Sequence, residues 1–107
     1  MRKLFTQSEI TKAAKLIGIS PFTRGNMWYW MKAGVFPKPY SSIKGKYSWY
    51  KRNDIILGLI NVYSRLIVAR KIDEKLAPSW KDMEKVMDLV AKDSPEITDE
   101  LSKLSKI

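Results

Sequence analysis

The 107-residue sequence contains neither cysteine nor histidine. Without cysteine there is no disulfide framework and no thiolate metal site. Without histidine the chain lacks the usual general base and the usual metal ligand. The basic part of the chain also has few carboxylates, so no catalytic constellation can be assembled there. We therefore expect a protein that is not an enzyme and that needs no metal or cofactor.

Long apolar runs are missing as well. No run approaches the roughly 20 residues that a membrane-spanning helix requires. Arg2 and Lys3 are not followed by the apolar segment of a secretory signal. We expect a cytoplasmic protein with no membrane partner. The hydrophobic content of 45% still supports a core, and the length suits one domain with a short appendage.

Acidic residues are almost missing from the first two thirds of the chain. Residues 1–71 carry 14 Lys or Arg and only two acids, Glu9 and Asp54, for a net charge of +12. Residues 72–107 carry six Lys and nine acids, for a net charge of −3. A segment this basic matches a phosphate backbone, so we expect nucleic acid as the partner. We divide the chain into a basic domain, 1–71, and an acidic helical extension, 72–107, used for packing or oligomerisation.

The first helix is expected directly after Phe5. Thr6 can cap it, and Glu9 three residues later completes a capping box. Apolar residues then recur at helical spacing, which predicts one buried face. Gly18 ends the helix in a left-handed conformation.

A second, short helix is expected from about Thr23 to Gly34, with three consecutive aromatic residues at its centre. Successive helical residues point about 100° apart, so the three rings cannot all face one core. The spacing predicts an inner face of Met27, Trp30 and Met31 and places Tyr29 outside. Trp28 lies on a flank, where contact with a partner and packing against Trp80 both stay open.

The residues after Gly34 predict an extended exit followed by a β-hairpin. Pro37 and Pro39 enforce the extended backbone. Residues 40–43 and 47–50 read as two strands joined by a turn at Gly45. Lys44 and Lys46 flank that turn, which gives the hairpin a basic tip.

Two helical segments follow the hairpin. Residues 55–71 are apolar nearly all round, which predicts a helix that is covered on more than one side. The second cover is either the C-terminal segment or another copy of the chain, so a homodimer stays open. Ser79 caps a further helix, whose apolar seam is Trp80, Met83, Met87 and Val90. A weaker helix is expected after Pro95.

The stretch from Phe5 to Ile60 resembles the MerR-type winged helix, and within that group it is most similar to phage excisionases and AlpA-type regulators. The most specific piece is the run Trp-x-Lys-x-Gly-x-Phe-Pro-x-Pro at residues 30–39, followed by the aromatic hairpin at 45–50. Gly18-Ile19-Ser20 matches the turn between the first two helices. The second helix departs from the family in having Trp28 and Tyr29 in place of a run of Arg.

The resemblance implies a mainly α fold with a small β-hairpin, namely a winged helix-turn-helix plus C-terminal helices, and a protein that binds double-stranded DNA. In this family the second helix enters the major groove and the wing touches the neighbouring backbone. The groove-facing positions would be Asn26, Trp28, Tyr29 and Lys32. The positions that contact phosphate would be Arg24, Lys38, Lys44 and Lys46.

Three functions remain open at this stage. The resemblance favours a phage or mobile-element protein that acts as an excisionase with a recombinase partner, or as an AlpA-like transcriptional regulator. A terminase small subunit-like packaging protein can have a similar winged fold. A basic adaptor that binds an acidic protein belongs to another class, and salt-dependent binding to duplex DNA separates it from the other two.

Overall fold

The computed structural model describes residues 3–42 and 48–92, which form four α-helices and a small antiparallel sheet. The elements in chain order are β1 (Leu4–Thr6), α1 (Gln7–Leu16), α2 (Arg24–Lys32), β2 (Ser41–Ser42), β3 (Ser48–Lys51), α3 (Arg52–Val68), the short 3-10 helix η1 (Glu74–Leu76) and α4 (Trp80–Lys92). The expectation of a mainly α fold is confirmed. In this part of the chain no helix is long and apolar enough to cross a membrane.

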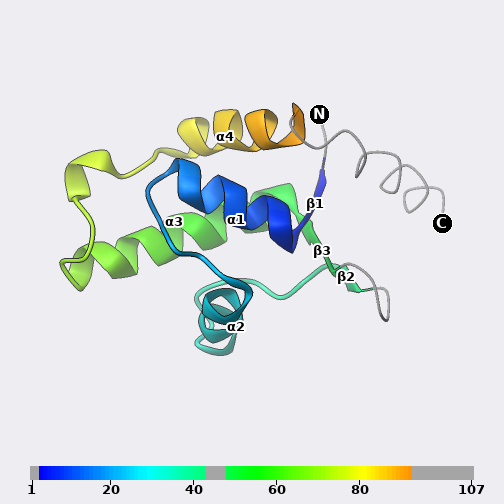
Figure 1. Ribbon diagram of the computed structural model, residues 1–107, viewed down its shortest axis with the longest axis horizontal. Helices are drawn as coiled ribbons and strands as arrows, with labels where there is room; N and C mark the ends of the chain where they lie inside the picture. Colours follow the sequence, from blue (N-terminus) through cyan, green and yellow to red (C-terminus); the bar gives the residue numbers. More distant parts are fainter. Residues whose placement is uncertain (1–2, 43–47, 93–107) are drawn as a thin grey trace.

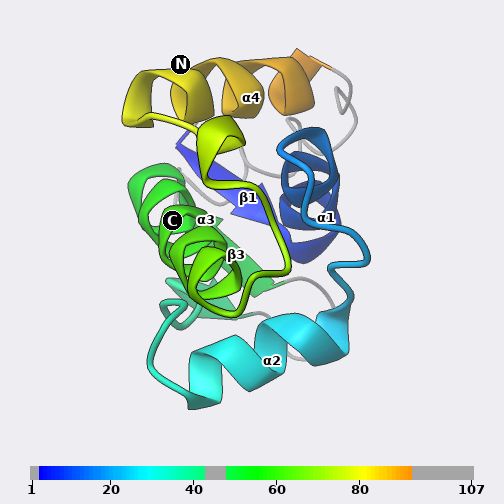
Figure 2. The same ribbon diagram turned by 90° about the vertical axis from the view of Figure 1, so that its left-hand side faces the viewer.

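The helices form three levels (Figures 1 and 2). Helices α1 and α3 lie side by side in the middle, α4 covers them on one side, and α2 crosses the opposite side. The middle level is tightly packed because α1, α3 and α4 each contribute fully buried side chains. These residues are Ile10, Ala13, Ala14, Ile55, Ile56, Leu59, Val62, Met83 and Met87. The small Ala13 and Ala14 let neighbouring elements approach α1 closely.

Helix α1 begins and ends as its sequence predicts. The Thr6 side chain accepts a hydrogen bond from the Glu9 backbone N–H, and the Glu9 carboxylate accepts one from the Thr6 backbone N–H at 2.9 Å. This reciprocal capping box satisfies two of the donors that a helix start leaves open. Gly18 follows the helix with φ +90°, a conformation that glycine adopts at little cost.

The first strand of the sheet is not evident from the sequence. The strands are ordered β1-β3-β2, and β1 pairs antiparallel with β3, Phe5 lying opposite Tyr50. This strand is three residues long and pairs with residues about 45 positions away. No local alternation marks it, so we had interpreted Phe5 and Thr6 only as the start of α1. The sheet therefore fixes the N-terminus of α1 to β3.

The structure contains the two paired strands of the predicted hairpin but does not describe its turn. Strand β2 pairs antiparallel with β3, with Ser41 opposite Trp49 and Ser42 opposite Ser48. The turn with Lys44, Gly45 and Lys46 lies outside the residues that the structure describes. A wing at this place therefore remains a prediction.

Helix α3 begins at Arg52, somewhat earlier than predicted, and ends at Val68. Its N-cap is Lys51, which makes no capping hydrogen bond through its side chain. The prediction of cover on more than one side is confirmed, because α4 contacts α3 and the Phe36-Pro37 segment lies on Gly58 of the same helix. Leu57 and Val68 remain exposed on the same helix.

The C-terminal extension packs back onto the basic domain. Ser79 caps α4 as expected, since its hydroxyl accepts from the Asp82 N–H at 3.1 Å and its own N–H donates to the Asp82 carboxylate at 3.0 Å. Met83, Met87 and Val90 form the predicted seam and are buried. Trp80 is 41% exposed and is not part of the seam, so that assignment was wrong. The helix predicted after Pro95 lies outside the described residues.

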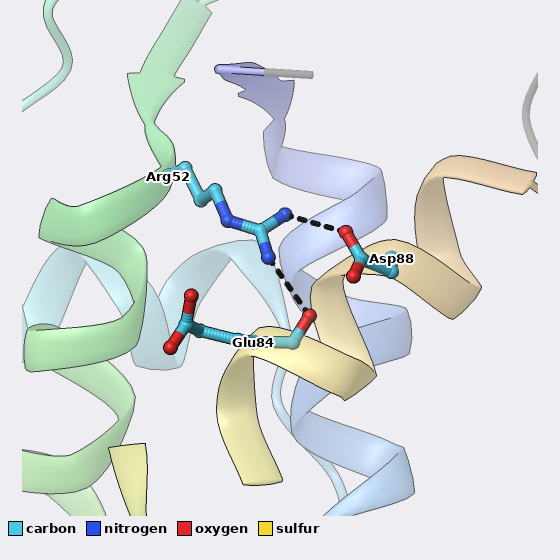
Figure 3. A network of polar contacts seen from close by, with 3 residues as sticks. All are labelled: Arg52, Glu84 and Asp88. Atoms are coloured by element: carbon cyan, nitrogen blue, oxygen red, sulfur yellow. Dashed lines mark hydrogen bonds and ion pairs between the residues drawn. The ribbon is translucent and has the colours of Figure 1, made fainter. Parts of the chain in front are cut away.

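A buried arginine joins the extension to the start of α3 (Figure 3). The Arg52 guanidinium donates to the Asp88 carboxylate at 3.0 Å and to the Glu84 backbone carbonyl at 2.9 Å. Arg52 follows β3 directly, so this contact holds α4 at the junction of sheet and helix. The Asp88 carboxylate is half exposed, which limits the strength of the ion pair but avoids a full desolvation cost.

Candidate nucleic-acid interface

Helix α2 begins with a capping box of its own. Thr23 is the N-cap, and its hydroxyl accepts a hydrogen bond from the Asn26 N–H at 3.2 Å. The Asn26 Oδ1 atom accepts in return from the Thr23 N–H at 3.0 Å and from the Thr23 hydroxyl at 2.8 Å. The helix start at Thr23 that the sequence predicts is confirmed.

The helix is held mainly by the segments on either side of it. Met27 is its one fully buried side chain. Phe22 precedes the helix and Phe36 follows it; both are buried, and their ring centroids lie 6.3 Å apart. Phe36 also meets the Tyr50 ring of β3 at 6.3 Å, nearly edge-on. Both ends of α2 are thereby fixed to the sheet, while most of its surface stays free.

Gly58 of α3 makes room for the exit from α2. A Cβ atom at this position would lie 2.5 Å from the Phe36 ring and 2.9 Å from the Pro37 ring. No side chain fits there without moving Phe36. The Phe-Pro exit thus lies directly on the α3 backbone, which sets the direction in which the chain leaves α2.

We define the outer face of α2 as Gly25, Trp28, Tyr29 and Lys32. Trp28 and Tyr29 are each 60% exposed, an unusual degree for two adjacent large rings. The Lys32 ammonium lies 5.0 Å from the centroid of the Trp28 ring, a cation–π contact along one helical turn. These residues are exposed, and α2 lies on the side of α1 and α3 opposite to α4 (Figure 2). The outer face presents aromatic surface and positive charge with no carboxylate in the helix.

Gly25 has no packing role. A Cβ atom there would meet only the Thr23 hydroxyl, at 3.7 Å, an ordinary contact. Its φ is not in the left-handed region, so the backbone does not require glycine either. Glycine weakens a helix relative to alanine by roughly 0.5–1 kcal/mol. The fold does not explain this residue, whereas close approach of a ligand to the helix would.

The three consecutive aromatic residues divide as follows. Trp28 does not pack against Trp80, because both rings are exposed and they belong to helices on opposite sides of the molecule. Trp30 was expected in the core, but it is only half-buried and packs at the edge of the core. Its ring meets Tyr29 edge-on, with centroids 5.1 Å apart. Trp30 therefore packs against both the core and the Tyr29 ring.

The other two residues predicted to face the groove, Asn26 and Lys32, differ in whether their side chains are available. Asn26 is exposed, but its Oδ1 atom is engaged in the capping box. Bidentate pairing with adenine needs that oxygen as well as the amide nitrogen. Lys32 is exposed and shares the outer face with Trp28 and Tyr29. The structure thus brings three of the four predicted groove residues onto one face and gives Asn26 a role within the helix start.

Of the four residues predicted to contact phosphate, the structure describes two, Arg24 and Lys38. Arg24 and Lys38 are exposed at the two ends of the α2 segment. Burial raises the pKa of the Tyr50 hydroxyl above its ordinary value, and the positive charge of Arg24 opposes that rise. Lys44 and Lys46 lie outside the described residues.

Tyr40 and Lys51 form a second pairing of ring and cation that was missed in the sequence. The Tyr40 ring is exposed, and the Lys51 ammonium lies 4.5 Å from its centroid. Tyr40 adjoins β2 and Lys51 ends β3, so only the strand register brings them together. A tyrosine directly after the Pro-Lys-Pro exit was the one sequence signal for this site.

The two carboxylates of the basic domain do not offset its surface charge. Glu9 is fully buried and occupied by the capping box of α1, and Asp54 is partly buried in the first turn of α3. The exposed charges between residues 3 and 42 are therefore all positive among the residues described. A surface of this kind attracts polyanions over distances of about 10 Å at ordinary ionic strength.

No protein-family model, curated protein or solved structure matches this chain.

Proposed function

We propose that the protein binds double-stranded DNA, with the outer face of α2 in the major groove. The observation that carries the proposal is this face itself: two exposed aromatic rings and a lysine around a glycine that packing does not require. The absence of exposed carboxylates among the described residues of 3–42 supports a phosphate-rich partner. A helix about nine residues long fits the major groove of B-DNA.

Arg24, Lys38, Lys44 and Lys46 supply the phosphate contacts of the proposal. The first two flank α2, and the last two lie at the predicted wing tip. Contacts of this kind position the protein and carry no sequence information. Four such contacts give a slope of log affinity against log salt of roughly −3 to −4. Loss of any one cation should reduce the slope by about 1 and weaken binding to all sequences alike.

The resemblance to phage excisionases and AlpA-type regulators supports a role in a phage or mobile element. On that basis we propose site-specific DNA binding that either directs a recombinase or regulates transcription. The basis for this finer role is the Trp-x-Lys-x-Gly-x-Phe-Pro-x-Pro run with the following hairpin. The packing of Phe36 and Pro37 on Gly58 explains why such a run is needed, since it directs the chain from α2 into the sheet.

The decisive experiment measures binding of a fluorescent duplex of random sequence by anisotropy, over a series of salt concentrations. The key variants are Trp28→Ala and Trp80→Ala, which make the same change on opposite sides of the molecule (Figure 1). We expect Trp28→Ala to lower affinity at least tenfold and Trp80→Ala to leave it unchanged. No binding at low salt, or equal loss in both variants, would contradict the proposal.

A protein partner is the second candidate, because exposed tryptophan and tyrosine are also typical of protein interfaces. In that case Trp28→Ala would not change duplex binding, and the affinity for duplex DNA would be weak at every salt concentration.

A terminase-like packaging role shares the DNA contacts of the first proposal. It additionally needs assembly of several copies, for which Leu57 and Val68 of α3 are two of the exposed apolar residues. Light scattering with and without Leu57→Ser tests that assembly and the homodimer together.

A further inference from the structure

Two polar side chains of α2 that could read a base edge, Asn26 and Lys32, already make contacts within the protein. The Oδ1 atom of Asn26 accepts two hydrogen bonds from Thr23. The Lys32 ammonium lies over the Trp28 ring. Arg24, the one arginine of the helix, is exposed at its first position and is assigned to phosphate in the proposal. Readout of bases by hydrogen bonds from Asn26 Oδ1 or Lys32 would therefore have to break contacts that these side chains already make.

The exposed apolar surface of α2 lies around Gly25. Residues three and four apart are neighbours on a helix, so Trp28 and Tyr29 both border Gly25. Helical side chains lean toward the N-terminus, so both rings lie beside the turn that contains Gly25, and neither has an atom within 4 Å of a Cβ at that position. Apart from the Thr23 hydroxyl, no atom would lie within 4 Å of a Cβ at Gly25. The surface between the two rings is thus open down to the backbone.

One group in the major groove is complementary to such a surface. The 5-methyl group of thymine is the apolar feature that distinguishes A·T from the other base pairs. We propose that α2 selects its DNA sites through thymine methyl groups, which Trp28 and Tyr29 contact over Gly25. This inference rests on the proposed binding of duplex DNA and names the base feature that the same face recognises.

The test begins with high-affinity duplexes selected from a random-sequence pool by the wild-type protein. Each thymine of a selected duplex is then replaced singly by deoxyuridine, which removes the methyl group and keeps every hydrogen-bonding group. We expect about a fourfold loss of affinity at one or two positions, the effect of one buried methyl group. Restoring a methyl group at those positions with 5-methylcytosine in a C·G pair should recover part of the loss relative to cytosine.

The same duplexes are measured with Trp28→Ala, Tyr29→Ala and Tyr29→Phe. In the alanine variants the preference for thymine over deoxyuridine should fall towards unity at one position each. Tyr29→Phe keeps the ring and should keep the preference. Circular dichroism and urea unfolding check that the variants fold, as expected for side chains that are 60% exposed.

The possible outcomes distinguish a failure of the thymine-methyl inference from a failure of the proposed DNA binding. Failure to bind any duplex removes the proposed function and the inference with it. Binding that is indifferent to deoxyuridine at every position overturns the inference and leaves the function standing. The inference is also overturned if deoxyuridine lowers affinity equally in the wild type and both alanine variants, because the methyl group would then act through DNA shape. Loss of the preference in Tyr29→Phe would assign the readout to the hydroxyl group.

Discussion

Helices α2 and α4 lie on opposite sides of the same two-helix layer (Figure 2). They differ in the side chains that they bury and in those that they expose. Helix α4 buries Met83, Met87 and Val90 and exposes a mixture of acids and lysines. Helix α2 buries only Met27 and exposes two aromatic rings and no carboxylate. The first pattern is that of a helix whose apolar residues stabilise the fold. The second is that of a helix held by its flanking segments so that its own surface stays available.

With the proposed function, the difference predicts that stability and binding depend on different helices. Changes in the seam of α4 should affect unfolding, and changes on the outer face of α2 should affect binding. The boundary between the two is sharp, because α1 and α3 separate the helices (Figure 1). Four variants test this division, from the largest expected effect to the smallest.

The largest effect is expected from Met87→Ala. This side chain is fully buried between α4 and the middle layer, and a methionine-to-alanine change in a core costs about 2–5 kcal/mol of unfolding free energy. Urea unfolding followed by circular dichroism measures the loss. The matched control is Leu89→Ala on the exposed side of the same helix, which should cost less than about 0.5 kcal/mol. Similar losses in the two variants would contradict the assignment of the seam.

Gly58→Ala should destabilise the protein by about 1–3 kcal/mol, because its Cβ would overlap the Phe36 ring. The higher helix propensity of alanine opposes this cost by about 1 kcal/mol. Thermal unfolding measures the net effect, and the double variant Gly58→Ala with Phe36→Leu should recover part of it. A more stable Gly58→Ala protein would show that the Phe-Pro exit can move freely off α3.

Gly25→Ala should do the opposite of Gly58→Ala. The added methyl group meets no obstacle, so the unfolding free energy should rise by up to about 1 kcal/mol. Affinity for duplex DNA should nevertheless fall several-fold, because the methyl group would occupy the surface between Trp28 and Tyr29. Urea unfolding and anisotropy on the same preparation measure the two quantities. An unchanged affinity would mean that no ligand approaches the helix at Gly25.

The smallest effect concerns the start of α4 at acid pH. Hydrogen bonds from the Ser79 backbone and side chain hold the pKa of the exposed Asp82 carboxylate below its ordinary value. A lowered pKa in the folded state stabilises the fold above the unfolded pKa of about 3.9, and this contribution disappears as the pH falls through the folded value. Asp82→Ala should therefore be less stable than the wild type at pH 7. The difference should shrink below about pH 4 in urea titrations across that range, and a constant difference would exclude this origin.

Local signals in the sequence were sufficient for the starts of α1, α2 and α4 and their caps, but not for the start of α3 at Arg52. Thr6 with Glu9, Thr23 at the start of α2, and Ser79 with Asp82 are all read correctly, since each cap depends on residues within three positions. Strand β1 and the pairing of Tyr40 with Lys51 were missed because they depend on register between distant segments. Trp80 was misassigned for a related reason. Its spacing fits the seam, but a residue in the first turn of α4 extends beyond the surface that α1 and α3 offer.

The sequence by itself determined the basic and acidic parts of the chain, the capped starts of α1, α2 and α4, and the fact that three consecutive aromatic residues cannot share one buried face. Charge, capping and periodicity are local properties, so they can be read without knowing what packs on what. Only the tertiary structure decided that Trp28 and Tyr29 are exposed, and that Gly25 is not needed for packing whereas Gly58 is. These outcomes depend on which surfaces the other helices and the sheet occupy.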